Sequence, residues 1–222
     1  NNGTVENHLE VPTLDENGNL QDDEVSRKWV AALNDIKELY DLGYFPPNTL
    51  TATDEETVSL FGNGKAAFLV DGSWQVGHLG ERFGDKIENM AVRFVPGKGE
   101  RKATEGIGGI SMGYFITRKA WKNPEKRDAA VRFVEMLTSN EILSTFIRTE
   151  VTALIDGASP VGLNSLEQSA AETNARLTRV SLAVQDAISA EAKSTLFTSI
   201  QKVVTGQMTA EKAVATAIQR NE

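Results

Sequence analysis

The chain has 222 residues and no cysteine, and its 31 acidic residues outnumber its 23 lysines and arginines, which gives a formal net charge of −8. A content of 40% hydrophobic and 24% charged residues is typical of a folded globular protein and excludes a disordered one. The acidic balance argues against nucleic-acid binding, and the absence of cysteine excludes disulfides, thiolate catalysis and cysteine-based metal sites. The longest apolar run, Ala66–Val70, is too short to span a membrane. Because the chain opens at Asn1 and not at Met, we interpret it as a processed product or a part of a longer chain.

The opening segment predicts a turn at Asn17-Gly18, because this dipeptide readily adopts the positive φ of a tight turn. The alternating acidic and amide residues around it also resemble a calcium loop. The EF-hand pattern, however, requires glycine where Leu20 stands and glutamate where Ser26 stands. We therefore expect a turn and no metal here.

Two helices are predicted next. Apolar residues recur at three- and four-residue steps over Asp23–Leu42, and Gly43 follows as a C-terminal cap. A second helix is predicted to begin at Thr53, where Thr53 and Glu56 have the spacing of a capping box, and to end at Gly62–Gly64.

Strands are predicted for the middle of the chain. The uninterrupted apolar run Ala66–Val70 is typical of a strand buried on both faces, and Met90–Val95 and Met112–Thr117 are predicted as further strands. After the first of these strands, a helix is predicted to run to about Phe83 with Ser73 as its N-cap.

Helices are predicted for most of the remaining chain. Asn123–Glu125 is typical of a helix start, Ser139–Glu141 begins a short helix, and Asp156–Leu163 is the best linker candidate. Beyond the linker, one apolar stripe at helical spacing consists of Leu177, Val180, Val184 and Ile188. The next helix is predicted to end at Gly206 and the last to begin at Thr209. Such sparse strand content indicates part of an α/β protein.

The sequence contains no catalytic constellation. Neither His8 nor His78 has the partner that a metal site on a helix would use. The pair Gly64-Lys65 resembles a phosphate-binding loop but lacks its first glycine and its final hydroxyl. The Gly106-x-Gly108 pattern lacks the third glycine of a dinucleotide fingerprint. We therefore expect no metal and no cofactor.

Trp74 is the strongest candidate for contact with a ligand. It directly follows a predicted buried strand, and ligands of open α/β sheets bind at the carboxyl ends of strands. The flat apolar face of an indole suits the C–H-rich face of a pyranose ring. The alternative is that Trp74 packs in the core, and the residues alone leave both interpretations open.

An ordered set of segments resembles the extracellular solute-binding proteins of ABC importers, specifically the sugar-binding family that includes maltose-binding protein. The segments are Leu39–Pro47, Leu60–Phe68, Asp71–Trp74, Gly108-Gly109, Lys122–Glu125, Phe133–Ser139, Val204–Gly206 and Thr209–Ala213. The resemblance covers nearly the whole chain but only the C-terminal half of the family's usual length.

The resemblance implies a helix-rich α/β fold, periplasmic-binding-protein-like and of type II, in which two lobes close on a ligand about a hinge. This chain would be a fragment that lacks most of the N-terminal lobe. By analogy, residues 1–105 form the first part of the C-terminal lobe, 106–162 return to the N-terminal lobe, and 163–222 are the helical remainder of the C-terminal lobe. The Gly-rich segment Glu105–Gly113 then falls at a crossing that can absorb hinge rotation.

The resemblance also implies a function. The protein would be the non-enzymatic substrate-binding component of an ABC transporter, capturing a sugar or oligosaccharide and delivering it to the membrane permease. It would be extracellular or periplasmic, with a lipid anchor as one option in the full-length protein. Trp74 matches the family's sugar-stacking aromatic residue, and Gly108 and Gly109 match a glycine pair near the ligand. Asp71 and Ser73 are expected to bind sugar hydroxyls at the same turn.

Other observations limit this interpretation. Relatives often place a further aromatic residue where this chain has Ser189–Lys193, which argues against a maltodextrin-like stacked oligosaccharide. Trp29 and Trp121 match no ligand position and are interpreted as packing residues. The alternatives are a non-sugar solute on the same scaffold, an enzyme with its catalytic residues in the absent half, and a helix-rich interaction module. We also expect the orphaned return segment to rearrange or to pair with a second copy, so the fragment would self-associate.

Overall fold

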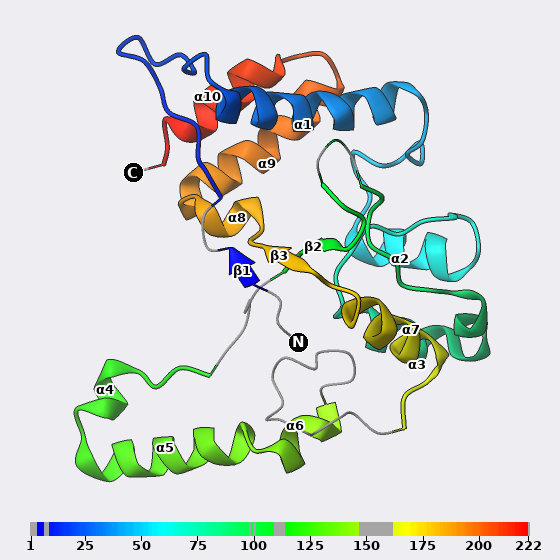
Figure 1. The fold of residues 1–222 in the computed structure, drawn as a ribbon, viewed down its shortest axis with the longest axis vertical. Helices are drawn as coiled ribbons and strands as arrows, with labels where there is room; N and C mark the ends of the chain where they lie inside the picture. Colours follow the sequence, from blue (N-terminus) through cyan, green and yellow to red (C-terminus); the bar gives the residue numbers. More distant parts are fainter. Residues whose placement is uncertain are drawn as a thin grey trace. The chain divides into compact units, whose positions relative to one another are not determined.

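The computed structural model describes residues 4–6, 9–97, 99, 101–108, 114–146 and 162–221. These residues divide into two compact units, each described below by itself. Unit 1 takes its residues from 54–106 and 110–178, and unit 2 from 4–53, 107–109 and 179–222. The elements, labelled in Figure 1, are β1 Thr4–Glu6, α1 Glu24–Asp41, α2 Asp54–Gly62, α3 Gln75–Phe83, the 3-10 helix η1 Gly84–Asn89, β2 Glu105–Ile107, α4 Arg118–Trp121, α5 Pro124–Leu137, α6 Asn140–Phe146, α7 Ser165–Asn174, β3 Arg179–Ser181, α8 Val184–Ala187, α9 Ala190–Val204 and α10 Ala210–Ile218.

The described strands form one short sheet in the order β1-β3-β2. Strands β1 and β3 are parallel, with Val5 opposite Val180. Directly after β2, the Gly108 N–H donates to the carbonyl of Ser181 at 2.9 Å. The chain passes from unit 1 to unit 2 within β2 and again immediately before β3.

Helix α1 of unit 2 agrees with its sequence pattern at both ends. The Asp23 carboxylate accepts a hydrogen bond from the Ser26 N–H at 2.8 Å and so caps the N-terminus. At the other end, Gly43 has φ +74°, the left-handed conformation that ends many helices. The predicted helix over Asp23–Leu42 is confirmed to within a residue at each end.

The turn predicted at Asn17-Gly18 is also confirmed. Gly18 has φ +77°, and Leu14 and Leu20 face each other across the turn as an antiparallel bridge. The Asp15 carboxylate accepts hydrogen bonds from the backbone N–H groups of Asn19 at 2.8 Å and Asn17 at 2.9 Å. The bond from the Asn19 backbone is the largest cause that holds the pKa of Asp15 below its ordinary value. The alternating polar residues therefore serve the turn itself.

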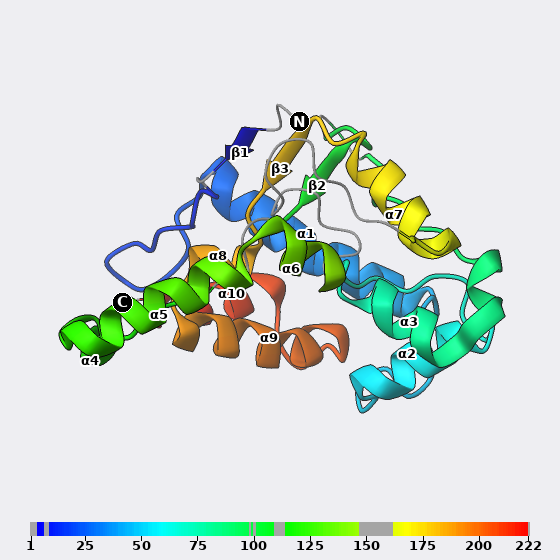
Figure 2. The same cartoon turned by 90° about the horizontal axis from the view of Figure 1, so that it is seen from below.

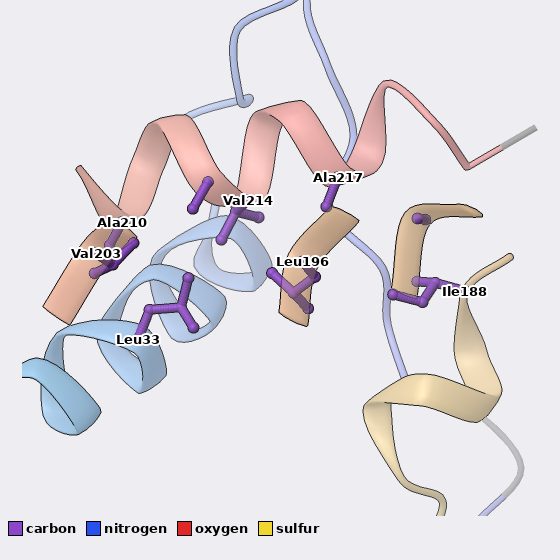
Figure 3. Packing of buried hydrophobic residues seen from close by; sticks show 9 residues of the cluster. Leu33, Ile188, Leu196, Val203, Ala210, Val214 and Ala217 are labelled. Carbon is purple, nitrogen blue, oxygen red and sulfur yellow. The ribbon is translucent and has the colours of Figure 1, made fainter. Parts of the chain in front are cut away.

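The core of unit 2 lies among α1, α9 and α10. Figure 3 shows side chains from these helices and from Ile188 pointing toward one another. The buried members are Leu33, Ile188, Ala192, Leu196, Val203, Ala210, Ala213, Val214 and Ala217. Between α9 and α10, Gly206 has φ +73° and reverses the chain, and the Thr209 hydroxyl accepts from the Lys212 N–H at 3.2 Å to begin the last helix. Both predicted boundaries are confirmed.

Unit 1 has a smaller core built from α2, α3, η1 and α7, of which α3 and α7 lie side by side (Figure 1). Its buried members are Val58, Val76, Leu79, Ile87, Leu166 and Ala170. Helix α7 begins with a complete capping box, because Asn164 accepts from the Glu167 N–H and Glu167 accepts from the Asn164 N–H. The sequence interpretation missed this signature.

The prediction of a strand at Met90–Val95 is wrong. The extended segment there is held by side chains of α7 and not by a neighbouring strand. The Val92 N–H donates to the Ser169 hydroxyl at 3.0 Å, and the Thr173 hydroxyl donates to the Val92 carbonyl at 2.9 Å. Two hydroxyls one helical turn apart therefore replace the ladder bonds that a strand partner would supply.

The strand prediction for Ala66–Val70 is also wrong. The segment has no strand pairing, and Phe68 and Val70 are 88% and 87% exposed. An apolar run of this kind needs neighbouring strands on both sides to satisfy its backbone and bury its side chains. The described residues contain no such neighbours. The predicted strand Met112–Thr117 likewise has no strand over 114–117, and Met112 lies outside the described residues.

Helices α4, α5 and α6 follow one another along the chain (Figure 2). The Asn123 carboxamide accepts from the N–H groups of Glu125 and Lys126, and Pro124 occupies the first turn, as predicted. The predicted start of α6 is confirmed as well. Helix α5 packs on α4 and α6, and none of its residues is buried. These helices therefore form for local reasons and contribute little core.

The helical stripe predicted from Leu177 to Ile188 is wrong. The region contains β3 and the short helix α8. Val180 pairs with Val5 of β1, so its apolar character serves a strand, whereas Ile188 belongs to the unit 2 core. The two periods cannot be distinguished over so few residues. Most of the predicted linker Asp156–Leu163 lies outside the described residues.

The two units do not coincide with the predicted segments 1–105, 106–162 and 163–222, and the assignment of those segments to lobes stays a prediction. None of the described helices combines the length and the apolar character that crossing a bilayer requires.

Candidate functional site

Three of the candidate residues, Asp71, Ser73 and Trp74, lie together in the turn that precedes α3. The Asp71 carboxylate accepts from the Gly72 N–H at 2.7 Å. The Gly72 carbonyl accepts from the Gln75 N–H, and the Ser73 carbonyl accepts from the Val76 N–H, both at 3.1 Å. These bonds join the turn to the first turn of the helix.

Helix α3 anchors this turn to unit 1. Val76 and Leu79 are buried in the unit 1 core, three residues apart on one face of the helix. The prediction of Ser73 as the N-cap is wrong, because the N-cap position is occupied by Trp74 with helical φ −59° and ψ −26°. Trp74 therefore stands at the exact point where the turn becomes helix.

The Trp74 side chain is 64% exposed. Its benzo ring lies against the α-carbon of Gly72, two residues earlier. An indole of this size normally buries much of its area in a core or at an interface. The alternative that Trp74 is a core residue of unit 1 is therefore not supported, and the ring offers an apolar surface supported from below by the turn.

Gly108 belongs to unit 2, next to strand β3. A Cβ placed on Gly108 would lie 3.2 Å from Cγ1 of Val180, so the glycine permits a close approach of the two segments. Gly109, the second residue of the expected pair, lies outside the described residues. The expectation that this glycine pair and Trp74 share one site stays a prediction.

A polar hollow of about 390 Å³ lies between α2 and α3, and sequence reasoning missed it. Its lining residues are Asp54, Glu55, Val58, Gln75, His78, Glu81 and Arg82. An ion pair of 2.5 Å between Glu55 and Arg82 links the two helices at this hollow. No sequence motif joins residues so far apart. Within the part of the chain that the structure describes, no group of three or more histidine or acidic side chains is arranged to hold a metal ion.

The other two tryptophans have different environments. Trp29 packs against the unit 2 core, and its indole N–H donates to the Glu10 carbonyl at 3.1 Å, as expected for a packing residue. Trp121 is 54% exposed, and the guanidinium of Arg127 lies 5.7 Å from its ring centre. The interpretation of Trp121 as a packing residue therefore needs correction, because α4 and α5 have no core to receive it.

Comparison with known proteins identifies the family of the chain. Residues 6–161 match the family described as bacterial extracellular solute-binding protein, and the chain belongs to this family. Among solved structures, the chain is similar to one described as "Chitin oligosaccharide binding protein", with a TM-score of 0.75 and 25% sequence identity. The match covers 86% of this chain and 48% of that protein, so the chain spans about half the length of its structural relative. No curated protein matches the chain.

The comparisons agree with the expected fold class. The chain is helix-rich and belongs to a solute-binding family, and its match to about half of the structural relative fits a part of a two-lobed fold. Both the family and the structural relative are described as binding proteins and not as enzymes. The family description is that of an extracellular protein.

Proposed function

We propose that the chain is part of the substrate-binding component of an ABC transporter, which captures a sugar or oligosaccharide between two lobes and delivers it to the membrane permease. The observation that carries this proposal is the exposed Trp74 indole at an ordered turn. Membership of the solute-binding family and similarity to a chitin oligosaccharide binding protein support it. The protein itself has no enzymatic activity in this proposal and acts outside the cell or in the periplasm, with a lipid anchor as one option.

Recognition would begin with the indole. Trp74 stacks on the apolar face of a pyranose ring, while Asp71 and Ser73 bind hydroxyls at the edge of the same turn. Gly108 and Gly109 are expected to lie near the ligand, because they match the glycine pair of the family. Carbohydrate sites combine such an aromatic platform with a few directed polar groups, because the first supplies affinity and the second supplies orientation.

The lobe assignment is part of the same proposal. Residues 1–105 and 163–222 belong to the C-terminal lobe, and residues 106–162 return to the N-terminal lobe. Closure of the lobes on the sugar would then form the surface that docks on the permease. Because the chain spans about half of its structural relative, we expect the 222 residues alone to bind sugar with millimolar affinity or more weakly.

The test is a sugar titration of the full-length protein with Trp74→Ala. Loss of a stacked indole should weaken binding by about 1–3 kcal/mol. Trp121→Ala is the matched control, since Trp121 is also exposed but lies on α4 and matches no expected ligand position. Equal affinities for the wild type and Trp74→Ala would show that the sugar binds elsewhere.

A thermal-shift screen of sugars, peptides and polyamines tests which class of solute the protein binds. A ligand present at about 100 times its dissociation constant stabilises the folded state by about 2.7 kcal/mol. Stabilisation by a non-sugar solute alone would support the same scaffold with another cargo. Turnover of a glycoside would support an enzyme instead.

We further propose that the isolated chain self-associates through its exposed apolar segment. Phe68 and Val70 lie two residues apart and are both largely exposed, while Leu69 between them packs against the core of unit 1. Exposed apolar side chains of this kind promote pairing with another copy. Phe68→Asp should shift the chain toward monomer in sedimentation velocity. Tyr44→Asp, an equally polar change at an exposed aromatic residue of unit 2, should leave the distribution unchanged. A wild-type chain that is monomeric at all concentrations would contradict this proposal.

A further inference from the structure

Gly72 is the residue beneath the Trp74 indole. A Cβ placed on Gly72 would lie 2.2 Å from both Cη2 and Cζ3 of the indole and 2.5 Å from Cε3. Real Cβ atoms do not approach other heavy atoms so closely, so the benzo ring occupies the volume that any other side chain would need. The ring therefore rests directly on the glycine α-carbon.

The backbone itself does not require glycine at this position. Gly72 is not among the glycines with positive φ, in contrast to Gly18, Gly43 and Gly206. Its N–H is held by the Asp71 carboxylate and its carbonyl by the Gln75 N–H, two bonds that an alanine would also make. The three atoms nearest to a Cβ at residue 72, its chain neighbours aside, all belong to the Trp74 indole.

A second glycine in unit 1 has a similar contact but a different purpose. A Cβ on Gly62 would lie 2.2 Å from the ring of Phe83, and that ring packs against the buried core of unit 1. The Gly62 contact is explained by dense packing. The Trp74 indole is largely exposed, so packing does not explain why it should lie on Gly72.

We infer that Gly72 is a positioning residue, which lets the Trp74 indole lie flat on the turn and present its open side to a ligand. This inference rests on the proposed function for its meaning, but its geometry can be tested without ligand. A side chain at residue 72 would push the indole out of this orientation, since the ring cannot share the space. The candidate site thereby gains a residue that would not touch the sugar itself.

The experiment uses the 222-residue chain with Trp29→Phe and Trp121→Phe, so that Trp74 is the sole tryptophan and its emission can be excited selectively over that of tyrosine. In this background, Gly72→Ala should shift the indole emission to the red and increase its quenching by acrylamide, because the ring moves off the backbone. Gly77→Ala is the matched control, as Gly77 lies in α3, lacks positive φ, and has open space where a Cβ would be. Identical emission and quenching for Gly72 and Gly72→Ala would overturn the inference.

A double-mutant cycle covers the case in which Gly72→Ala fails to fold. If the clash with the indole is the cause, Gly72→Ala should be tolerated when Trp74→Ala is also present, and the two changes should couple strongly. If Gly72→Ala disrupts folding equally with and without the indole, the glycine serves the backbone and the inference is wrong.

Sugar binding to the full-length protein then separates this inference from the proposed function. With a chitin oligosaccharide as the probe, Gly72→Ala should weaken binding about tenfold, with little further loss on adding Trp74→Ala. A displaced indole together with unchanged sugar affinity would keep the positioning role and reject the proposed sugar site. An undisplaced indole with lost affinity would reject the positioning role alone.

Discussion

Unit 2 has a larger buried core than unit 1, although both units leave some large apolar side chains exposed. In unit 2, Val203 and Val214 from consecutive helices are fully buried, and α1 covers them. In unit 1, Phe68 and Val70 are largely exposed although Leu69 between them packs against the core, and no residue of α5 is buried. Both units nevertheless form helices whose N-termini are capped by side chains.

This difference between the two units shows that helix formation and core formation have separate requirements. A helix satisfies its own backbone and needs only suitable caps and residues, so α5 forms although nothing described covers it. A strand satisfies its backbone only through neighbours, so Ala66–Val70 remains unpaired where its neighbours are lacking. This behaviour is what a chain similar to about half of its structural relative should show.

The largest expected effect comes from truncating the unit 2 core. Leu196, on α9, is 4% exposed, and Leu196→Ala should lower the free energy of unfolding by about 2–5 kcal/mol because it leaves a cavity among three helices. Urea denaturation followed by circular dichroism measures the change. Phe68→Ala, which removes a larger side chain in unit 1, should change stability by less than about 0.5 kcal/mol.

The difference between the two destabilisations shows whether Phe68 is exposed in solution as Leu196 is buried. Equal destabilisation by Leu196→Ala and Phe68→Ala would mean that the apolar run of unit 1 is covered in solution. The self-association proposed above would then be the first explanation to examine, by repeating the Phe68→Ala measurement over a range of concentrations.

An intermediate effect is expected from the helix caps. The Thr209 side chain caps α10, a helix whose buried face belongs to the unit 2 core. Thr209→Ala should therefore lower the free energy of unfolding by about 1 kcal/mol. The Asn123 side chain caps α5 in the same way, but no residue of α5 is buried. Asn123→Ala should therefore speed amide hydrogen exchange in α5 and leave the unit 2 transition unchanged.

Hydrogen exchange resolved by mass spectrometry measures both cap effects in one experiment. If Asn123→Ala lowered the stability of the whole chain as much as Thr209→Ala does, α5 would be coupled to a core. The distinction drawn between the two units would then fail.

The sequence predicted the helices well because their signals are local. Caps such as Asn123, the glycine after α1 at Gly43 and the chain reversal at Gly206 depend only on neighbouring residues. The strand predictions failed because pairing is decided far along the chain. The Ser169 and Thr173 hydroxyls replace a strand partner for Val92, and no sequence pattern near Val92 predicts these contacts.

The candidate site was predictable only in part. The turn Asp71–Trp74 was visible as a Gly-Ser break after an apolar run, and its aromatic residue is exposed as a ligand platform must be. The contact between Trp74 and Gly72 was not predictable, because it depends on a side-chain orientation and not on a spacing. The hollow between α2 and α3 was not predictable either, since it joins acids of one helix to Arg82 of another.

The smallest expected effect is a pH dependence confined to the N-terminal end of α1. The hydrogen bond from the Ser26 backbone is the largest cause that lowers the pKa of Asp23 from 3.8. A folded-state pKa below the unfolded one means that the cap stabilises α1 fully above about pH 3.8 and is lost as the pH falls through the lower folded value. Glu24, whose pKa is lowered mainly by the hydrogen bond with Lys28, acts in the same direction.

Asp23→Asn separates the charge from the cap, because the carboxamide oxygen still accepts from the Ser26 N–H but does not titrate in this range. The variant should show a shallower loss of unit 2 stability between pH 5 and the acid limit, measured as urea midpoints at a series of pH values. Since the side chain is at the surface, the change should be small and should shrink further in high salt. Asp23→Ala, which removes the cap altogether, should instead lower the midpoint wherever the wild-type cap is formed, most fully above about pH 3.8. If the urea midpoint of Asp23→Asn fell with pH as steeply as that of the wild type, the acid sensitivity of unit 2 would come from other carboxylates. Asp15 would be the next to substitute, because its pKa is also lowered by backbone hydrogen bonds.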